Sequence, residues 1–210
     1  MTSGVHYMAA YFLLFAAVHS LLADPGFKSP ARAALGGGYD RWQRLGYNML
    51  AIFMVLPFLF LLVFLPGRVV YSIPPPWNWA MMAGQMLAAW AALVTLRSTG
   101  VSSFLGLDHL QRKGAGSGGQ ADGRARRLVT DGFYGRVRHP LYVSSLLFLW
   151  LIPIMTESLL AFNICATLYF ILGARHEERS LVMQFGSEYE EYRRSVPMFL
   201  PRLRPIKKSI

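Results

Sequence analysis

Apolar residues fall into five long blocks separated by polar segments. The blocks cover residues 5–22, 45–65, 77–96, 141–155 and 159–173. Each block except the short fourth one is close to the roughly 17 to 25 residues with which a helix crosses a bilayer. The pattern predicts an all-α integral membrane protein with five transmembrane helices.

The last two blocks are separated only by residues 156–158, with Pro153 just before them, which predicts a tight helical hairpin. A re-entrant hairpin and a spanning pair of helices both return the chain to the same side. The sequence therefore leaves open whether the fourth helix fully crosses the membrane. The charged stretch 175–194 keeps apolar residues at helical spacing and predicts an amphipathic helix with a candidate break at Gly186. A turning tail with Pro197 and Pro201 follows.

Composition and charge place the chain in the membrane and orient it. Hydrophobic residues make up 54% and charged residues 15%, against about 25% charged residues in soluble domains. Of the 21 Lys and Arg residues, only Arg68 lies in a segment on the opposite side from the other 20. This positive-inside asymmetry predicts an external N-terminus and a cytoplasmic C-terminus in the inner membrane, and it explains the net charge without nucleic-acid binding.

The same pattern divides the chain into three parts. Residues 1–96 are expected to form a three-helix transmembrane region, and residues 97–135 a cytoplasmic linker with a glycine-rich loop. Residues 136–210 would hold the hairpin and the C-terminal segment.

One candidate site is the start of the fourth helix, at Arg138, His139 and Pro140. Proline suits a first helical turn, so unpaired backbone donors and the positive end of the helix dipole lie beside His139. This arrangement favours an anionic group of a ligand. The alternative interpretation is an orientation signal with a helix-starting proline.

A second candidate site follows the fifth block, at His176, Glu177, Glu178 and Arg179. Glutamates at a membrane boundary require polar or charged partners, and the hairpin would return them toward His139. Because neighbouring helical residues point in different directions, at most one glutamate is expected to face a shared pocket. The alternative is a solvated helix start. No histidine pair or cysteine pair has zinc spacing, so no metal is expected.

These residues resemble the membrane methyltransferases typified by isoprenylcysteine carboxyl methyltransferase. The resemblance covers roughly the last eighty residues and rests on three ordered motifs. They comprise Arg138, His139, Pro140, Leu141 and Tyr142, then Glu177, Glu178, Arg179 and Leu181, then Phe185, Gly186, Tyr189, Tyr192, Arg193, Val196, Pro197 and Pro201.

Shorter upstream segments are similar to methanethiol S-methyltransferases and their NnrU-type relatives. They comprise His19, Ser20, Leu21, Leu22, Ala23, Pro25, Phe27 and Lys28, and then Phe104, Leu105, Gly106, Leu107 and Gln111. The upstream similarity favours a small or lipophilic thiol, methanethiol-like, as the methyl acceptor.

The resemblance implies that S-adenosylmethionine is the cofactor. It would bind between the hairpin and the C-terminal segment, with His139, Pro140, Leu141, Tyr142, Glu177, Glu178, Tyr189 and Pro197 as cofactor-binding residues. Arg193 and Glu178 would lie nearest the methyl group. A cation at Arg138 or Arg193 would lower the pKa of a bound thiol.

Other functions remain open on the same scaffold. The acceptor can instead be a phospholipid amine or a prenylcysteine carboxylate. An NADPH-dependent reductase and a non-catalytic NnrU-like membrane protein are the alternatives from other classes. The expected partners are a thiol and membrane lipid, and the sequence leaves the oligomeric state open.

Overall fold

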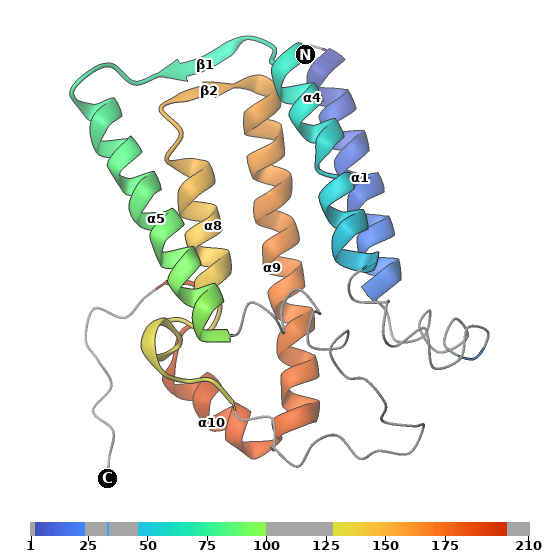
Figure 1. Ribbon diagram of the computed structural model, residues 1–210, viewed down its shortest axis with the longest axis vertical. Coiled ribbons are helices and arrows are strands. Elements are labelled where there is room, and N and C mark those ends of the chain that lie inside the picture. Colours follow the sequence, from blue (N-terminus) through green and yellow to red (C-terminus); the bar gives the residue numbers. More distant parts are fainter. Residues whose placement is uncertain (1–2, 24–32, 34–45, 100–127, 201–210) are drawn as a thin grey trace. The chain divides into compact units, whose positions relative to one another are not determined.

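The computed structural model describes residues 3–23, 33, 46–99 and 128–200 (Figure 1). Most of the predicted glycine-rich linker lies outside the described residues. So do parts of the motifs noted above, namely Pro25, Phe27, Lys28, residues 104–111 and Pro201.

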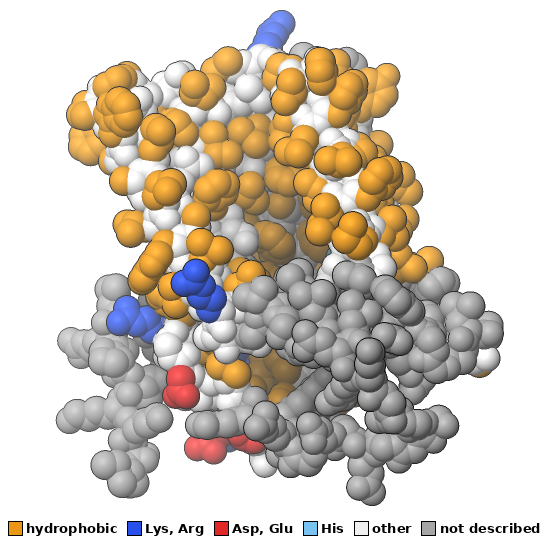
Figure 2. Space-filling model, in the orientation of Figure 1, with side chains coloured by type: hydrophobic (Ala, Val, Ile, Leu, Met, Phe, Trp, Pro, Cys, Tyr) orange, Lys and Arg blue, Asp and Glu red, His pale blue; other side chains and the backbone are white. Residues whose placement is uncertain are grey.

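Four described helices are long and apolar enough to cross a membrane. They are α1 (Ser3–Ala23), the stretch Gly46–Phe64 that contains α4 (Leu56–Phe64), α5 (Trp77–Thr99) and α9 (Glu157–Phe185). Apolar side chains cover α5 on the face drawn in Figure 2. These helices match four of the predicted blocks and indicate an integral membrane protein.

The fourth predicted block forms a shorter helix, α8 (Pro140–Trp150), of 11 residues. At 1.5 Å per residue it is about 16 Å long, roughly half of a hydrocarbon core. The described residues are therefore mostly helical as predicted, and the fourth block forms a helix shorter than the four long ones.

The connection between the last two helices differs from the predicted tight turn. Residues Ile154–Thr156 form strand β2, which pairs with β1 (Val69–Ser72) in a two-stranded sheet. The first amides of α9 also find acceptors there: Glu157 N donates to Arg68 O at 2.9 Å, and Ser158 N donates to Pro66 O at 3.1 Å. The pairing satisfies backbone groups that a turn would leave exposed.

The structure divides into two compact units. The described parts of the first are α1, the stretch 46–71 and residues 154–165. Its core is a set of edge-on and tilted aromatic contacts with ring centroids 4.7 to 5.9 Å apart, made by Tyr11, Phe12, Phe15, Phe58 and Phe162.

A close backbone approach in the first unit provides a stability prediction. A Cβ at Gly4 would overlap the Leu65 carbonyl oxygen and come within 2.8 Å of Ser158 Oγ, which itself donates to that carbonyl. Since backbone cannot move aside cheaply, we expect Gly4→Ala to lower the free energy of unfolding by about 1 to 3 kcal/mol. Thermal unfolding in detergent measures the loss.

Gly46→Ala is the matched control, because its Cβ would meet nothing within 4 Å. Alanine has the higher helix propensity, so Gly46→Ala should leave the melting temperature unchanged or raised. Equal melting temperatures of the two variants would contradict the close packing at Gly4.

The second unit holds the remaining helices. Its described parts are residues 72–99, 128–153 and 166–200. Helix α8 lies between α5 and the second half of α9 (Figure 1). Gln85 Nε2 donates to Phe148 O at 2.9 Å, and Trp150 Nε1 donates to Thr167 Oγ1 at 3.0 Å. These bonds join α8 to both neighbours within the apolar region. Hydrogen bonds between helices contribute there to helix association.

The charged stretch after the fifth block also folds as two helices. Helix α9 continues to Phe185, and α10 (Ser187–Ser195) follows after Gly186, whose φ of 56° favours glycine. The predicted break at Gly186 is confirmed. A 3₁₀ turn, η1 (Gly132–Gly135), precedes α8. Tyr189, Tyr192 and Val196 form a buried cluster against Leu128, Leu181, Val182 and Phe185.

Candidate active site

The start of α8 is joined to the C-terminal segment through the backbone. Pro140 occupies the first turn and His139 is the N-cap residue. The amide of Arg138 donates to Pro197 O at 2.9 Å, and that of His139 donates to Met198 O at 3.3 Å. Two stretches almost sixty residues apart in sequence therefore pair directly at the helix start.

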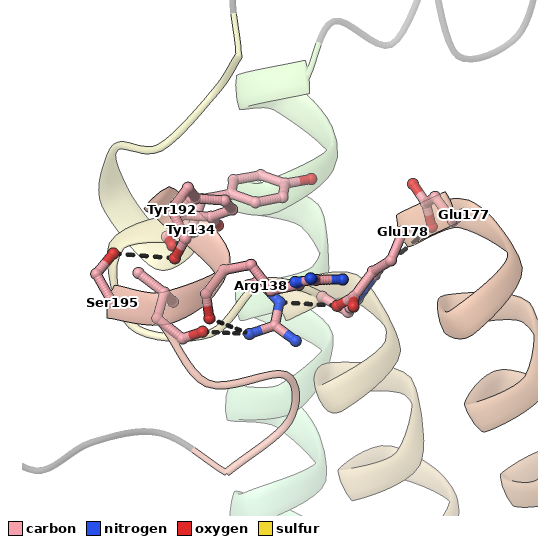
Figure 3. Close-up of polar contacts among 9 residues, drawn as sticks. Tyr134, Arg138, Glu177, Glu178, Tyr192 and Ser195 are labelled. Carbon is pink, nitrogen blue, oxygen red and sulfur yellow. Dashed lines mark hydrogen bonds and ion pairs between the residues drawn. The ribbon is translucent and has the colours of Figure 1, made fainter. Parts of the chain in front are cut away.

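Arg138 connects three elements through its guanidinium (Figure 3). Its Nε donates to Glu178 Oε1 on α9 at 2.7 Å, and its Nη1 donates to the carbonyl of Arg193 at 2.9 Å and to that of Val196. The side chains of Arg138 and Glu178 are each 10% exposed. A buried, charge-assisted ion pair with two further carbonyl acceptors is a strong arrangement.

His139 lies between the two adjacent glutamates. Its Nε2 is 3.2 Å from Glu178 Oε1, and its Nδ1 is 3.5 Å from Glu177 Oε2. The ring stacks on Tyr142 with centroids 5.4 Å apart, and the Tyr142 hydroxyl donates to Glu177 Oε2 at 3.2 Å. The two candidate clusters of the sequence thus form one hydrogen-bonded group.

A cavity of about 200 Å³ adjoins this group. It is lined by Thr99, Leu128, Val129, Tyr134, Arg138, His139, Glu177, Leu181, Phe185, Tyr189 and Tyr192. Glu177, half exposed, lines the cavity, whereas Glu178 is in the buried ion pair. Of the two glutamates, Glu177 therefore faces this cavity, in keeping with the expectation that at most one faces a shared pocket.

The tyrosine hydroxyls of the cavity wall keep their protons at neutral pH. Burial raises the pKa of Tyr134 to about 12, and the negative charge of Glu177 adds to the effect. Burial, with the charge of Glu178, also raises the pKa of Tyr189 to about 12. The pKa of Tyr192 is raised for the same reason of burial. The wall therefore offers neutral hydroxyls and aromatic faces.

Tyr189 has a buried hydroxyl in this wall. Its side chain is 1% exposed, and its hydroxyl meets no acceptor or donor at hydrogen-bond geometry within the described ranges, although Arg138 lies near enough to affect its pKa. Arg138 acts on this hydroxyl as a nearby donor, so Tyr189 belongs to the polar group around the guanidinium.

The structure brings most of the site residues named from the sequence together. Arg138, His139, Tyr142, Glu177, Glu178 and Tyr189 belong to the group or the cavity wall, and Pro197 contributes its carbonyl. Pro140 is buried in the first turn of α8, and Leu141 follows it in the same turn.

Arg193 is placed differently from the other named residues. Its side chain is exposed on α10, and its backbone carbonyl accepts a hydrogen bond from Arg138. Tyr134, by contrast, lines the cavity and was missed by the sequence reasoning. The available signal was its place four residues before Arg138, in an aromatic pair between two glycines.

Comparison with curated proteins supplies the remaining observation. Methanethiol S-methyltransferase 2 of Bradyrhizobium diazoefficiens is 32% identical over 203 residues, covering 90% of this chain and 70% of that protein. The methanethiol S-methyltransferase of Mycobacterium tuberculosis is 29% identical over 202 residues, covering 90% of this chain and 74% of that protein. The chain belongs to the methanethiol S-methyltransferase family.

The chain also shares a shorter similarity with a second methyltransferase. The protein-S-isoprenylcysteine O-methyltransferase of Schizosaccharomyces pombe is 43% identical to this chain over 82 residues, covering 35% of this chain and 33% of that protein. Both resemblances noted in the sequence are therefore confirmed. No family model and no solved structure matches the chain.

Membership of the methanethiol S-methyltransferase family identifies the chain as a methyltransferase. This finding separates it from the reductase and the non-catalytic membrane protein, which the sequence had left open.

Proposed function

We propose that this protein transfers a methyl group from S-adenosylmethionine to methanethiol or a similarly small thiol. The observation that carries the proposal is the convergence of His139, Glu177 and the tyrosines of α10 on one cavity. It occurs in a chain whose relatives match it along most of its length and are named for this reaction.

The described residues fit one end of such a cofactor. Glu177 offers a carboxylate for amino or hydroxyl groups, and Tyr189 contributes its aromatic side chain to the cavity wall. Leu181 and Phe185 supply apolar contact area. A volume of about 200 Å³ is below the roughly 300 to 1,000 Å³ of whole-ligand pockets, so this cavity suits one part of the cofactor.

Bound S-adenosylmethionine would supply an electrophilic methyl group on a positively charged sulfur. The thiol sulfur would bond to this methyl carbon, and the bond from that carbon to the cofactor sulfur would break with its electron pair left on the cofactor. The thiol proton leaves to solvent or a base. Such a displacement requires alignment more than covalent catalysis, so the protein acts chiefly by positioning.

Within this proposal the charged residues divide the work. Glu178 and Arg138 hold α9, α8 and the C-terminal segment around the cofactor through their ion pair. His139, Pro140, Leu141, Tyr142, Glu177, Tyr189 and Pro197 bind the cofactor. Arg193 has an exposed guanidinium and is the residue we assign to lowering the pKa of the thiol.

The membrane arrangement we propose has five passages, with the N-terminus outside and the C-terminus in the cytoplasm. Helix α8 spans about 16 Å, and residues 151–156 carry the chain on to the start of α9, which we propose completes the fifth passage. The distribution of Lys and Arg supports the orientation. In this proposed orientation the cavity faces the cytoplasm, where a water-soluble cofactor has access.

A binding and product assay tests the proposed function. Tritium-labelled S-adenosylmethionine should bind the detergent-purified chain, and added methanethiol should give dimethyl sulfide in the headspace. Because Glu177 is a charged acceptor in the cavity wall, Glu177→Gln should weaken cofactor binding roughly tenfold to a hundredfold. The exposed Glu191→Gln is the matched control and should bind as the unmodified chain does.

Two results would overturn the proposal in different ways. No cofactor binding at millimolar concentration would remove the methyltransferase mechanism at this site. Cofactor binding with methylation of a prenylcysteine or a phospholipid amine, and no dimethyl sulfide, would keep the site and change the acceptor.

A further inference from the structure

Aromatic side chains form much of the wall of the cavity beside His139. Tyr134 comes from η1, Phe185 from the end of α9, and Tyr189 and Tyr192 from α10. The face of an aromatic ring carries a negative potential and attracts a cation within about 6 Å. A cavity built from such faces suits a positively charged, partly apolar group.

The charges around the cavity favour a cation as well. Glu177 presents a carboxylate to it. Arg138, the guanidinium among its described lining residues, is paired with Glu178 and also donates to two backbone carbonyls. Its positive charge is thus compensated by Glu178, which is not among the described residues that line the cavity. A cation entering here meets the Glu177 carboxylate, which also accepts from Tyr142, and several aromatic side chains.

Among the described aromatic residues that line the cavity, Tyr134 is the one whose side chain lies outside the buried cluster. Tyr192 donates its hydroxyl to the Tyr134 carbonyl and packs in the buried cluster with Tyr189 and Val196. The Tyr134 side chain is half-buried, lies outside that cluster and lines the cavity. Replacing its side chain leaves intact the carbonyl that Tyr192 uses.

We propose that Tyr134 is a specificity-determining residue that favours the positively charged sulfonium of the methyl donor over the neutral thioether of the spent cofactor. The inference rests on the proposed function. A cavity of about 200 Å³ holds the sulfonium end of the donor among ring faces and Glu177. After transfer the sulfur is uncharged, the attraction to the ring is lost, and the spent cofactor leaves more readily.

The test measures dissociation constants of S-adenosylmethionine and S-adenosylhomocysteine for the full chain in detergent. The unmodified protein should bind the donor more tightly than the product. Tyr134→Leu removes the ring and should reduce that ratio roughly threefold to thirtyfold, by weakening donor binding alone. Tyr134→Phe keeps the ring and should keep the ratio.

Phe133→Leu is the matched control, since Phe133 lies in the same turn but contacts Trp90 and does not line the cavity. Its ratio should be unchanged. Equal weakening of donor and product by Tyr134→Leu, or a reduced ratio in Tyr134→Phe, would overturn the role of the ring. Absence of donor binding in the unmodified chain would instead overturn the proposed function, so the two failures are distinguishable.

Discussion

Glu178→Ala is expected to unfold the region around the cavity and to abolish cofactor binding. The substitution leaves the Arg138 guanidinium, 10% exposed, without its carboxylate partner, and it also removes the acceptor beside His139 Nε2. Breaking a buried ion pair by deleting one partner costs about 3 to 5 kcal/mol. Chemical unfolding in detergent and labelled-cofactor binding measure the two effects.

Glu190→Ala provides the control for this prediction. Its pair with Arg194 is exposed and 3.9 Å long, so the loss should be about 0 to 1 kcal/mol. Similar stability losses in Glu178→Ala and Glu190→Ala would show that the buried pair has no special weight.

Arg138→Lys should bind the cofactor about 100-fold more weakly even though the positive charge is kept. A guanidinium presents donors in a fixed fork, and here the fork reaches Glu178 and the carbonyls of Arg193 and Val196 at once. A lysine ammonium cannot span all three. Losing two charge-assisted bonds, at about 1.5 kcal/mol or more each, gives this change in affinity.

A second readout separates this role from general destabilisation. The amides of Arg138 and His139 donate to carbonyls of Pro197 and Met198, so release of the C-terminal segment should accelerate hydrogen exchange in the peptide that contains them. The exposed Arg136→Lys, two residues earlier, should change neither exchange nor affinity. Unaltered hydrogen exchange in Arg138→Lys would contradict the proposal that Arg138 holds the C-terminal segment in place.

The long helices were predictable because lipid imposes a simple rule on them. A helix must satisfy its own backbone and present apolar side chains, so block lengths alone located α1, α5 and the stretch Gly46–Phe64. The joining of Arg138 and His139 to the paired glutamates was also predictable, since a hairpin returns its ends to one level. The choice between Glu177 and Glu178 depended on helix rotation, which sequence spacing leaves undetermined.

Other features depend on contacts between distant residues. The short pairing of β1 with β2 joins residues about eighty positions apart. The sequence of neither short strand identifies the other as its partner. Tyr134 could be recognised as a cavity residue only from the structure, in which η1, α9 and α10 together line the cavity. Arg193 lay in the expected motif, yet its side chain is exposed and its backbone carbonyl is the group that accepts from Arg138.

The backbone pairing of residues 138–139 with 197–198 has a consequence for biosynthesis. All four long helices and α8 are encoded upstream of that pairing, so a nascent chain can insert into the bilayer before the ribosome reaches Met198. The pairing beside His139 is completed only after that codon is translated. A premature stop codon shortly before it would leave a membrane-inserted polypeptide that keeps the residues lining the cavity but lacks this pairing.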